Sequence, residues 1–176
     1  MPDKFRDKYR IPSSRLQNWD YSDNGYYFIT ICTKERKHYF GEIINLKMQL
    51  SKIGEIAKKY WLEIQNHFSF VELNEFMIMP NHVHGIIIIC DSQRRDGACP
   101  VSTKRNTLGN VIGSFKSIVT KYANSHKILF HWQSRFYDRI IRNEKEFCRI
   151  KQYIKDNPMN WEEDRNNLSN QQPNCN

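Results

Sequence analysis

The stretch EFMIMPNHVHGIIIIC, residues 75–90, most constrains what this chain can fold into. Two strand-like apolar runs, FVELNEFMIM and HVHGIIII, are separated by Pro80-Asn81, a residue pair that ends one strand and opens the next. The second run contains His82 and His84, whose polar rings are costly to bury among isoleucines. Because residues two apart in a strand project from the same face, the two imidazoles are expected to lie side by side.

Two histidines on one face of a strand have two explanations. Imidazoles held by a rigid sheet form a ready bidentate site for a metal ion. Alternatively, both rings are structural and make only hydrogen bonds within the protein. The spacing of the two residues does not decide between these alternatives.

Strand and helix patterns alternate along the rest of the chain. Residues 26–33, YYFITICT, are β-branched and aromatic, and Gly25 marks the turn before them. A second short strand at about 38–44 is expected to pair with them. Residues 91–106 are polar, contain glycine and proline, and are expected to form a loop.

Three helices are expected from apolar residues spaced three and four apart. The first covers 51–66 and is capped by Ser51, and the second covers 108–122. The third begins at Asn143, whose capping box is completed by Glu146, and ends at Asn157-Pro158. The order of these patterns indicates an α+β domain in which helices pack on one antiparallel sheet.

Length and composition set further limits. The 176 residues are expected to form one domain over residues 1–161, followed by a disordered tail over 162–176. No apolar run reaches the roughly 18–20 residues of a membrane span, so no membrane partner is expected. The cysteines are odd in number, scattered and without CxxC spacing, which is typical of reduced thiols in a cytoplasmic protein. They are Cys32, Cys90, Cys99, Cys148 and Cys175.

Positive charge is concentrated in the C-terminal half. The formal net charge is +8, and residues 104–155 contain twelve Lys or Arg against three acidic residues. A nucleic acid is the natural partner of such a segment, and exposed aromatic side chains could stack on its unpaired bases. A solvated basic surface that binds nothing would give the same composition. The candidate phosphate-binding residues are Lys104, Arg105, Lys116, Lys121, Arg135, Arg139 and Arg142.

The last expected helix carries a second candidate for chemistry. Its core stripe consists of Phe147, Ile150 and Ile154. Tyr153 and Asn157 are four residues apart and therefore share one face of the helix. This spacing could place a phenol beside a metal ion held by the amide oxygen. The alternative is a surface tyrosine followed by an asparagine that ends the helix.

Together these segments resemble the single-tyrosine HUH transposases, and among them the REP-associated tyrosine transposases. MPNHVHGIIII is similar to their His-hydrophobic-His motif, and FYDRIIRNEKEFCRIKQYIKDNP is similar to the segment that carries their nucleophilic tyrosine. The similarity continues in RLQNWDYSDNGYYFITICT, FGEI and TLGNVIGSFKSIVTKY. It spans about residues 15–161.

The resemblance implies a ferredoxin-like fold, with the histidine pair on a central strand and the tyrosine helix across from it. It implies His82, His84 and Asn157 as ligands of Mg²⁺ or Mn²⁺, and Tyr153 as the nucleophile. Tyr137 is the rival nucleophile, but it lies in a strand-like run, where a packed tyrosine is expected.

The implied activity is cleavage and rejoining of single-stranded DNA that bears a hairpin, a repetitive palindromic type of element. The reaction would pass through a covalent 5′-phosphotyrosine link, and the enzyme would be a monomer or a homodimer. Two alternatives remain open. One is a domesticated DNA-binding protein that does not cut, and the other is a metal-dependent RNA nuclease that uses water and forms no covalent link.

Overall fold

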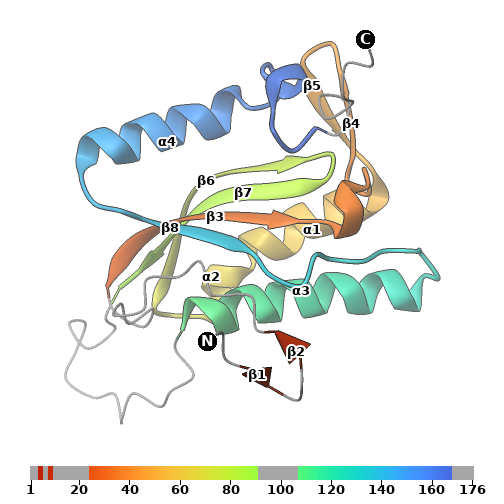
Figure 1. The fold of residues 1–176 in the computed structure, drawn as a ribbon, viewed down its shortest axis with the longest axis horizontal. Helices are drawn as coiled ribbons and strands as arrows, with labels where there is room; N and C mark the ends of the chain where they lie inside the picture. The colour runs from red at the N-terminus through yellow and green to blue at the C-terminus, as the bar shows by residue number, and fades with distance from the viewer. Residues whose placement is uncertain (1–3, 6–7, 10–23, 91–106, 168–176) are drawn as a thin grey trace.

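A four-stranded antiparallel sheet with strand order β6-β7-β3-β8 forms the centre of the protein (Figure 1). The computed structural model describes residues 4–5, 8–9, 24–90 and 107–167. The strands of the sheet are β6 (Val71–Met79), β7 (His82–Ile89), β3 (Gly25–Cys32) and β8 (Tyr137–Ile141). The expected antiparallel sheet with helices packed on it is therefore confirmed.

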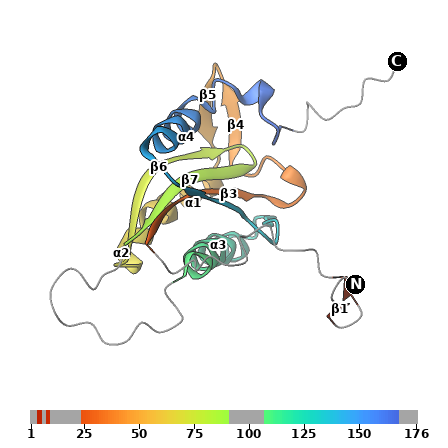
Figure 2. The same ribbon diagram turned by 60° about the vertical axis from the view of Figure 1, so that its left-hand side comes forward.

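Helices cover both faces of this sheet. Helix α4 (Glu144–Asp156) lies over one face, and α1 (Lys52–Leu62) and α3 (Leu108–Ser125) lie over the other (Figures 1 and 2). The short helix α2 (Ile64–His67) follows α1 directly. No helix in the described ranges is both long enough and apolar enough to span a bilayer.

Strand β7 has neighbours on both sides and is buried on both faces. Val83 and Ile87 belong to the large apolar cluster beneath α1 and α3, whereas Ile86 belongs to a smaller cluster beneath α4. Since side chains alternate along a strand, His82 and His84 share the face of Ile86. The histidine pair therefore faces α4.

The predicted helix caps are confirmed. The Ser51 hydroxyl accepts a hydrogen bond from the Gly54 amide at 3.1 Å, and the Asn143 side-chain oxygen accepts one from the Glu146 amide at 2.8 Å. The expected helix over 51–66 is divided at Glu63 into α1 and α2.

The expected pairing of residues 38–44 with 26–33 is wrong. Both edges of β3 are occupied, one by β7 and the other by β8. Instead β4 (Gly41–Ile44) forms a separate hairpin with β5 (Lys47–Leu50). Asn45 and Leu46 both have positive φ, which is the conformation that closes a two-residue hairpin.

The short elements complete the described chain. Strands β1 (Lys4–Phe5) and β2 (Lys8–Tyr9) pair with each other. The 3₁₀ turns are η1 (Lys34–Arg36) and η3 (Trp161–Glu163). The predicted loop over 91–106, with Cys99, Lys104 and Arg105, and the segment 168–176, with Cys175, lie outside the described residues.

The folded chain extends beyond residue 161, where we expected a disordered tail to begin. Asp164, Asn166 and Asn167 are buried. The backbone carbonyl of Asn166 accepts a hydrogen bond from the Asn81 side chain at 2.8 Å, next to the turn between β6 and β7. Polar contacts fix this segment, so its composition gave no sign of burial.

Gly85 is required where Trp61 of α1 packs against β7. A Cβ atom at Gly85 would lie 2.3 Å from Cζ2 of the fully buried Trp61 ring. We predict that Gly85→Ala lowers the free energy of unfolding by about 1–3 kcal/mol, since overpacking displaces a large ring. Urea denaturation measures this change.

Gly113→Ala is the matched control. A Cβ atom at Gly113, inside α3, would have no heavy atom within 4 Å. This substitution should stabilise the protein by about 0.5–1 kcal/mol, because alanine is the better helix former. Equal losses of stability in the two variants would contradict the packing described here.

Candidate active site

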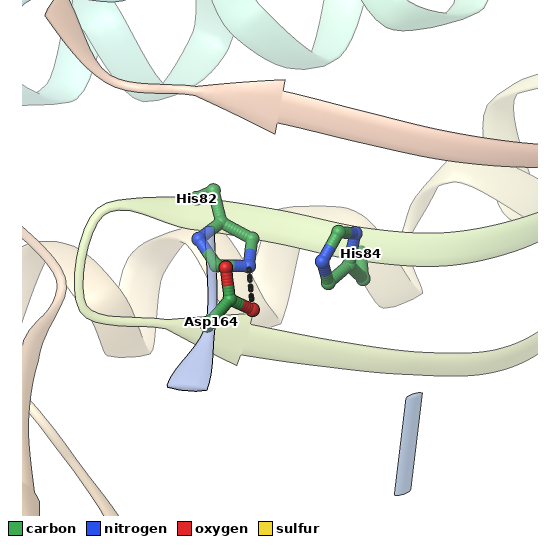
Figure 3. A group of neighbouring side chains, drawn as sticks. All are labelled: His82, His84 and Asp164. Carbon is green, nitrogen blue, oxygen red and sulfur yellow. Dashed lines mark ion pairs between the residues drawn. The ribbon is translucent and has the colours of Figure 1, made fainter. Parts of the chain in front are cut away.

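The histidine pair lies in the middle of the sheet with both rings fully buried. The ring centroids of His82 and His84 are 4.3 Å apart, and both side chains project from β7 on the same side (Figure 3). Nδ1 of His82 lies 2.8 Å from the side-chain oxygen of Asn81, and Nδ1 of His84 lies 2.9 Å from the Thr30 hydroxyl. The predicted juxtaposition of the two imidazoles is confirmed.

The Asn81 amide determines which nitrogen of His82 carries the proton. Its nitrogen donates to the backbone carbonyls of Arg36, at 3.0 Å, and Asn166, at 2.8 Å. Its oxygen is therefore an acceptor, and His82 Nδ1 is the donor to it. Consequently Nε2 of His82 carries a lone pair.

Both imidazoles are neutral at neutral pH. Burial lowers the pKa of His82 well below its ordinary value, and the nearby positive charge of Arg36 lowers it further. Burial also lowers the pKa of His84, although the Asp164 carboxylate opposes that shift. Neutral imidazoles are the form that binds metal ions.

Asp164 joins the histidine pair, a contact that the sequence did not indicate. Its Oδ2 lies 4.0 Å from Nε2 of His82, and Figure 3 shows the carboxylate beside that ring. One ligand atom from each of His82, His84 and Asp164 lies within 4.8 Å of the others. Within the described chain, Nε2 of His82 is buried without a hydrogen-bond partner. These residues could therefore hold a divalent metal ion, which would satisfy that nitrogen.

Asn157, the predicted third ligand, lies beside the same group at the end of α4. Its side-chain nitrogen donates to Oδ2 of Asp164 at 3.1 Å. Its Oδ1 is buried and has no hydrogen-bond partner among the described residues. The site therefore has two candidate oxygen ligands, an amide and a carboxylate, whereas the sequence indicated only the amide.

The Tyr153 hydroxyl lies 3.4 Å from Nε2 of His84. The ring packs edge-on against Phe28 and His84, yet 41% of the residue is exposed. Burial raises the pKa of Tyr153, and the Asp164 carboxylate raises it further, while a hydrogen bond from Asn157 opposes the shift. The phenol is therefore protonated at neutral pH unless more positive charge is supplied.

Tyr137 is not the packed side chain that we expected. It is 42% exposed, and the Arg165 guanidinium lies 5.9 Å from its ring centroid. Tyr137 pairs with Thr30 across the sheet, so both side chains lie on the face that carries His84. The exposure follows from the position of β8 at an edge of the sheet.

The sheet divides the predicted basic residues into two groups. Arg139 pairs with Phe28, which belongs to the cluster beneath α4, so Arg139 lies on the face of the histidine pair. Arg142 is exposed where the chain passes from β8 into α4. Lys116 and Lys121 lie on α3, across the sheet.

The two groups also differ in the contacts that their charged side chains make. Lys116 Nζ is half-buried and donates to the backbone carbonyls of Gln133, at 2.6 Å, and Ser134, at 3.3 Å. Arg139 forms an ion pair with Glu146 of α4. Arg135 is exposed just before β8. Lys116 therefore makes a structural contact, and the predicted basic residues that the structure describes lie on both faces of the sheet.

Comparisons with known proteins identify the family and the fold of this chain. No family model matches the chain. An uncharacterized protein of Haemophilus influenzae is 40% identical over 163 residues, which cover 87% of this chain and 91% of that protein. The chain belongs to the same family as that protein.

A solved structure of a REP-associated tyrosine transposase bound to a REP hairpin has the same fold. The TM-score is 0.58 and the identity 16%, and the match covers 85% of this chain and 74% of that chain. The resemblance to these transposases that the motifs indicated is therefore confirmed in the fold.

We predict that the group around His82 binds one Mn²⁺ ion and that Asp164 contributes to its affinity. His82→Ala and Asp164→Asn should each weaken binding at least about tenfold, because each removes a ligand or its charge. Isothermal titration calorimetry with Mn²⁺ measures the affinity.

Asp156→Asn is the matched control for Asp164→Asn. Asp156 ends α4, one residue before Asn157, and its carboxylate accepts from Gln152 at the surface. Its variant should change the affinity less than about twofold, as expected for a screened surface charge. If Asp164→Asn bound Mn²⁺ with wild-type affinity, Asp164 would not be a ligand, and Asn157 would be the oxygen ligand.

Proposed function

We propose that this protein is a single-tyrosine HUH transposase that cuts and rejoins single-stranded DNA bearing a hairpin. The observation that carries the proposal is the position of the partly exposed Tyr153 hydroxyl, 3.4 Å from a buried histidine pair. The shared fold of a transposase bound to a REP hairpin supports the substrate class.

The proposed site would hold Mg²⁺ or Mn²⁺ through His82 and His84, with Asn157, Asp164 or both as oxygen ligands. Two neutral imidazoles leave a bound cation strongly electrophilic, and an oxygen ligand suits either metal. When bound, the cation would supply positive charge to the scissile phosphate and to the developing phenolate.

The reacting residue is Tyr153. Its phenol oxygen would form a bond to the phosphorus as the bond from phosphorus to the 3′ oxygen breaks. The phenol gives up one proton and the departing 3′ oxygen takes one, so the step is balanced. Because the phosphotyrosine conserves the energy of the phosphodiester, a free 3′-hydroxyl can reverse the attack and rejoin the strand.

The two other functions are less well supported by the geometry. A nuclease that uses water has no need of a phenol beside the histidine pair. A protein that only binds DNA has no need of a buried neutral imidazole with an unsatisfied nitrogen, and within the described ranges Nε2 of His82 is such an atom. Both functions predict that no covalent link forms, so one experiment separates them from the proposal.

We predict that Tyr153 becomes covalently attached to DNA. Wild-type protein incubated with Mn²⁺ and an oligonucleotide that carries a hairpin and single-stranded flanks should give an adduct on a denaturing gel. Tyr153→Phe removes only the reacting oxygen, so it should bind the oligonucleotide normally and form no adduct.

Tyr137→Phe is the matched control, since Tyr137 is equally exposed on the same face of the sheet. This variant should still form the adduct. Peptide mapping of the trapped complex identifies the residue. An adduct on any other residue would refute the assignment of Tyr153, and cleavage without an adduct would favour the hydrolytic nuclease.

The division of the basic residues predicts which cations contact DNA. Neutralising a cation that contacts a phosphate lowers the slope of log affinity against log salt by roughly 0.7 for a single strand. We predict this change for Arg142→Ala, on the face of Tyr153, and no change for Lys121→Ala, on α3. Fluorescence anisotropy at several salt concentrations measures both slopes, and the reverse result would place the DNA on the face of α3.

A further inference from the structure

A hollow lies on the same face of the sheet as the histidine pair, near the start of α4. Its volume is about 490 Å³, within the range of small-ligand sites. The sheet residues that line it are opposite one another in the register, with Tyr26 of β3 between Ile88 of β7 and Ile141 of β8. Phe147 of α4 lines it as well, six residues before Tyr153, which is about 9 Å along the helix.

The lining combines flat apolar surfaces with the side chain of Asn74, which carries one unsatisfied polar atom. Tyr26 is 46% exposed, and its ring centroid lies 5.5 Å from that of Phe147 in an edge-on arrangement. Within the described chain, Oδ1 of Asn74 is buried and has no hydrogen-bond partner. Such an atom is costly unless a ligand or water donates to it. The hollow therefore suits a planar ring that carries an N–H group.

Asn74 lines the hollow at an irregularity in β6. The pairing of β6 with β7 shifts register between Leu73 and Phe76. A bulge of this kind redirects a side chain and is common beside functional sites. The adjacent Glu75 forms an ion pair with Lys155 of α4 at 3.5 Å. This ion pair connects the irregular segment to the helix that carries Tyr153.

Charged and aromatic side chains together indicate the kind of ligand. Arg142 and Glu144 both line the hollow and are exposed, so a ligand there lies beside one cation that can bind phosphate and one carboxylate. Aromatic surfaces with a nearby cation are the features by which proteins bind unpaired bases. Asn74 adds an acceptor for an exocyclic amine, which adenine, cytosine and guanine carry and thymine lacks.

We infer that this hollow binds one unpaired amine-bearing base of the strand whose phosphate reaches Tyr153. The inference rests on the proposed function for the identity of the strand. Base recognition here requires neither the metal ion nor the covalent step, so it can be measured separately from both.

The test uses methyl NMR spectra of the full chain with its isoleucine methyl groups labelled. Addition of the single strand dA10 should shift the signals of Ile88 and Ile141, which line the hollow. The signal of Ile112, buried beneath the opposite face, should stay in place. The strand dT10 should bind at least about fivefold more weakly, because thymine has no exocyclic amine.

The decisive variant is Asn74→Leu, which keeps the size of the side chain and removes its acceptor. It should weaken dA10 binding at least about fivefold, while the control Asn66→Leu, at an exposed position on α2, should change it less than twofold. Unchanged Ile112 and Ile86 signals in free Asn74→Leu would show that the sheet is intact. Tyr26→Ser is the second variant and should also weaken binding, through loss of stacking.

The possible outcomes distinguish the base site from the proposed function. If dA10 binds by anisotropy but leaves Ile88 and Ile141 unshifted, or if Asn74→Leu and Tyr26→Ser both bind it normally, the base site is refuted and the proposed function is unaffected. If Tyr153 forms no adduct but the shifts and the Asn74 effect appear, the base site stands and the proposed function fails. If neither strand binds, the base site is refuted, whereas the proposed function is decided by the adduct with the hairpin oligonucleotide.

Discussion

The burial of two imidazoles at the centre of the sheet is the constraint on which the rest of the structure depends. A buried imidazole is tolerated only if it is neutral and if its N–H has an acceptor. For His82 that acceptor is Asn81, the residue that turns β6 into β7. Because the same amide also donates to the carbonyls of Arg36 and Asn166, one side chain links the turn, η1 and the C-terminal segment. The turn is therefore part of the site and not only a connection.

The sheet supplies nitrogen atoms to the site, and the C-terminal region supplies oxygen atoms. Asn157 ends α4, and Asp164 follows η3, where Trp161 packs near the His82 ring with centroids 6.1 Å apart. The Asn157 nitrogen donates to Asp164, so the two oxygen-bearing residues position each other. A site assembled in this way is complete only when segments 82–84 and 157–164 are both folded. Its geometry therefore depends on tertiary structure as much as on the motif.

Periodicity was sufficient to predict relations within one element. Alternation along a strand placed His82 and His84 on one face, and helical spacing placed Tyr153 beside Asn157, since both relations follow from local geometry. Relations between elements were harder to predict. Which strands flank β3 depends on the whole sheet, so the partner assigned to residues 38–44 was wrong. Asp164 lies in EEDRNN, whose polarity is typical of a solvated tail, and polar contacts that bury such a segment leave no hydrophobic pattern.

In the proposed reaction, the electrostatics of the site would give the histidines, the carboxylate and the phenol complementary roles. His82 and His84 are neutral, so they do not balance the Asp164 carboxylate, and that carboxylate raises the pKa of Tyr153. Without further positive charge, the phenol of Tyr153 therefore stays protonated at neutral pH, and a protonated phenol is a poor nucleophile. In the proposed reaction, such a phenol would react only where a cation and a phosphate lie beside it, and it would not attack DNA elsewhere. In the proposed reaction the unfavourable pKa of Tyr153 would serve specificity, because the charge that activates the phenol would also orient the phosphate.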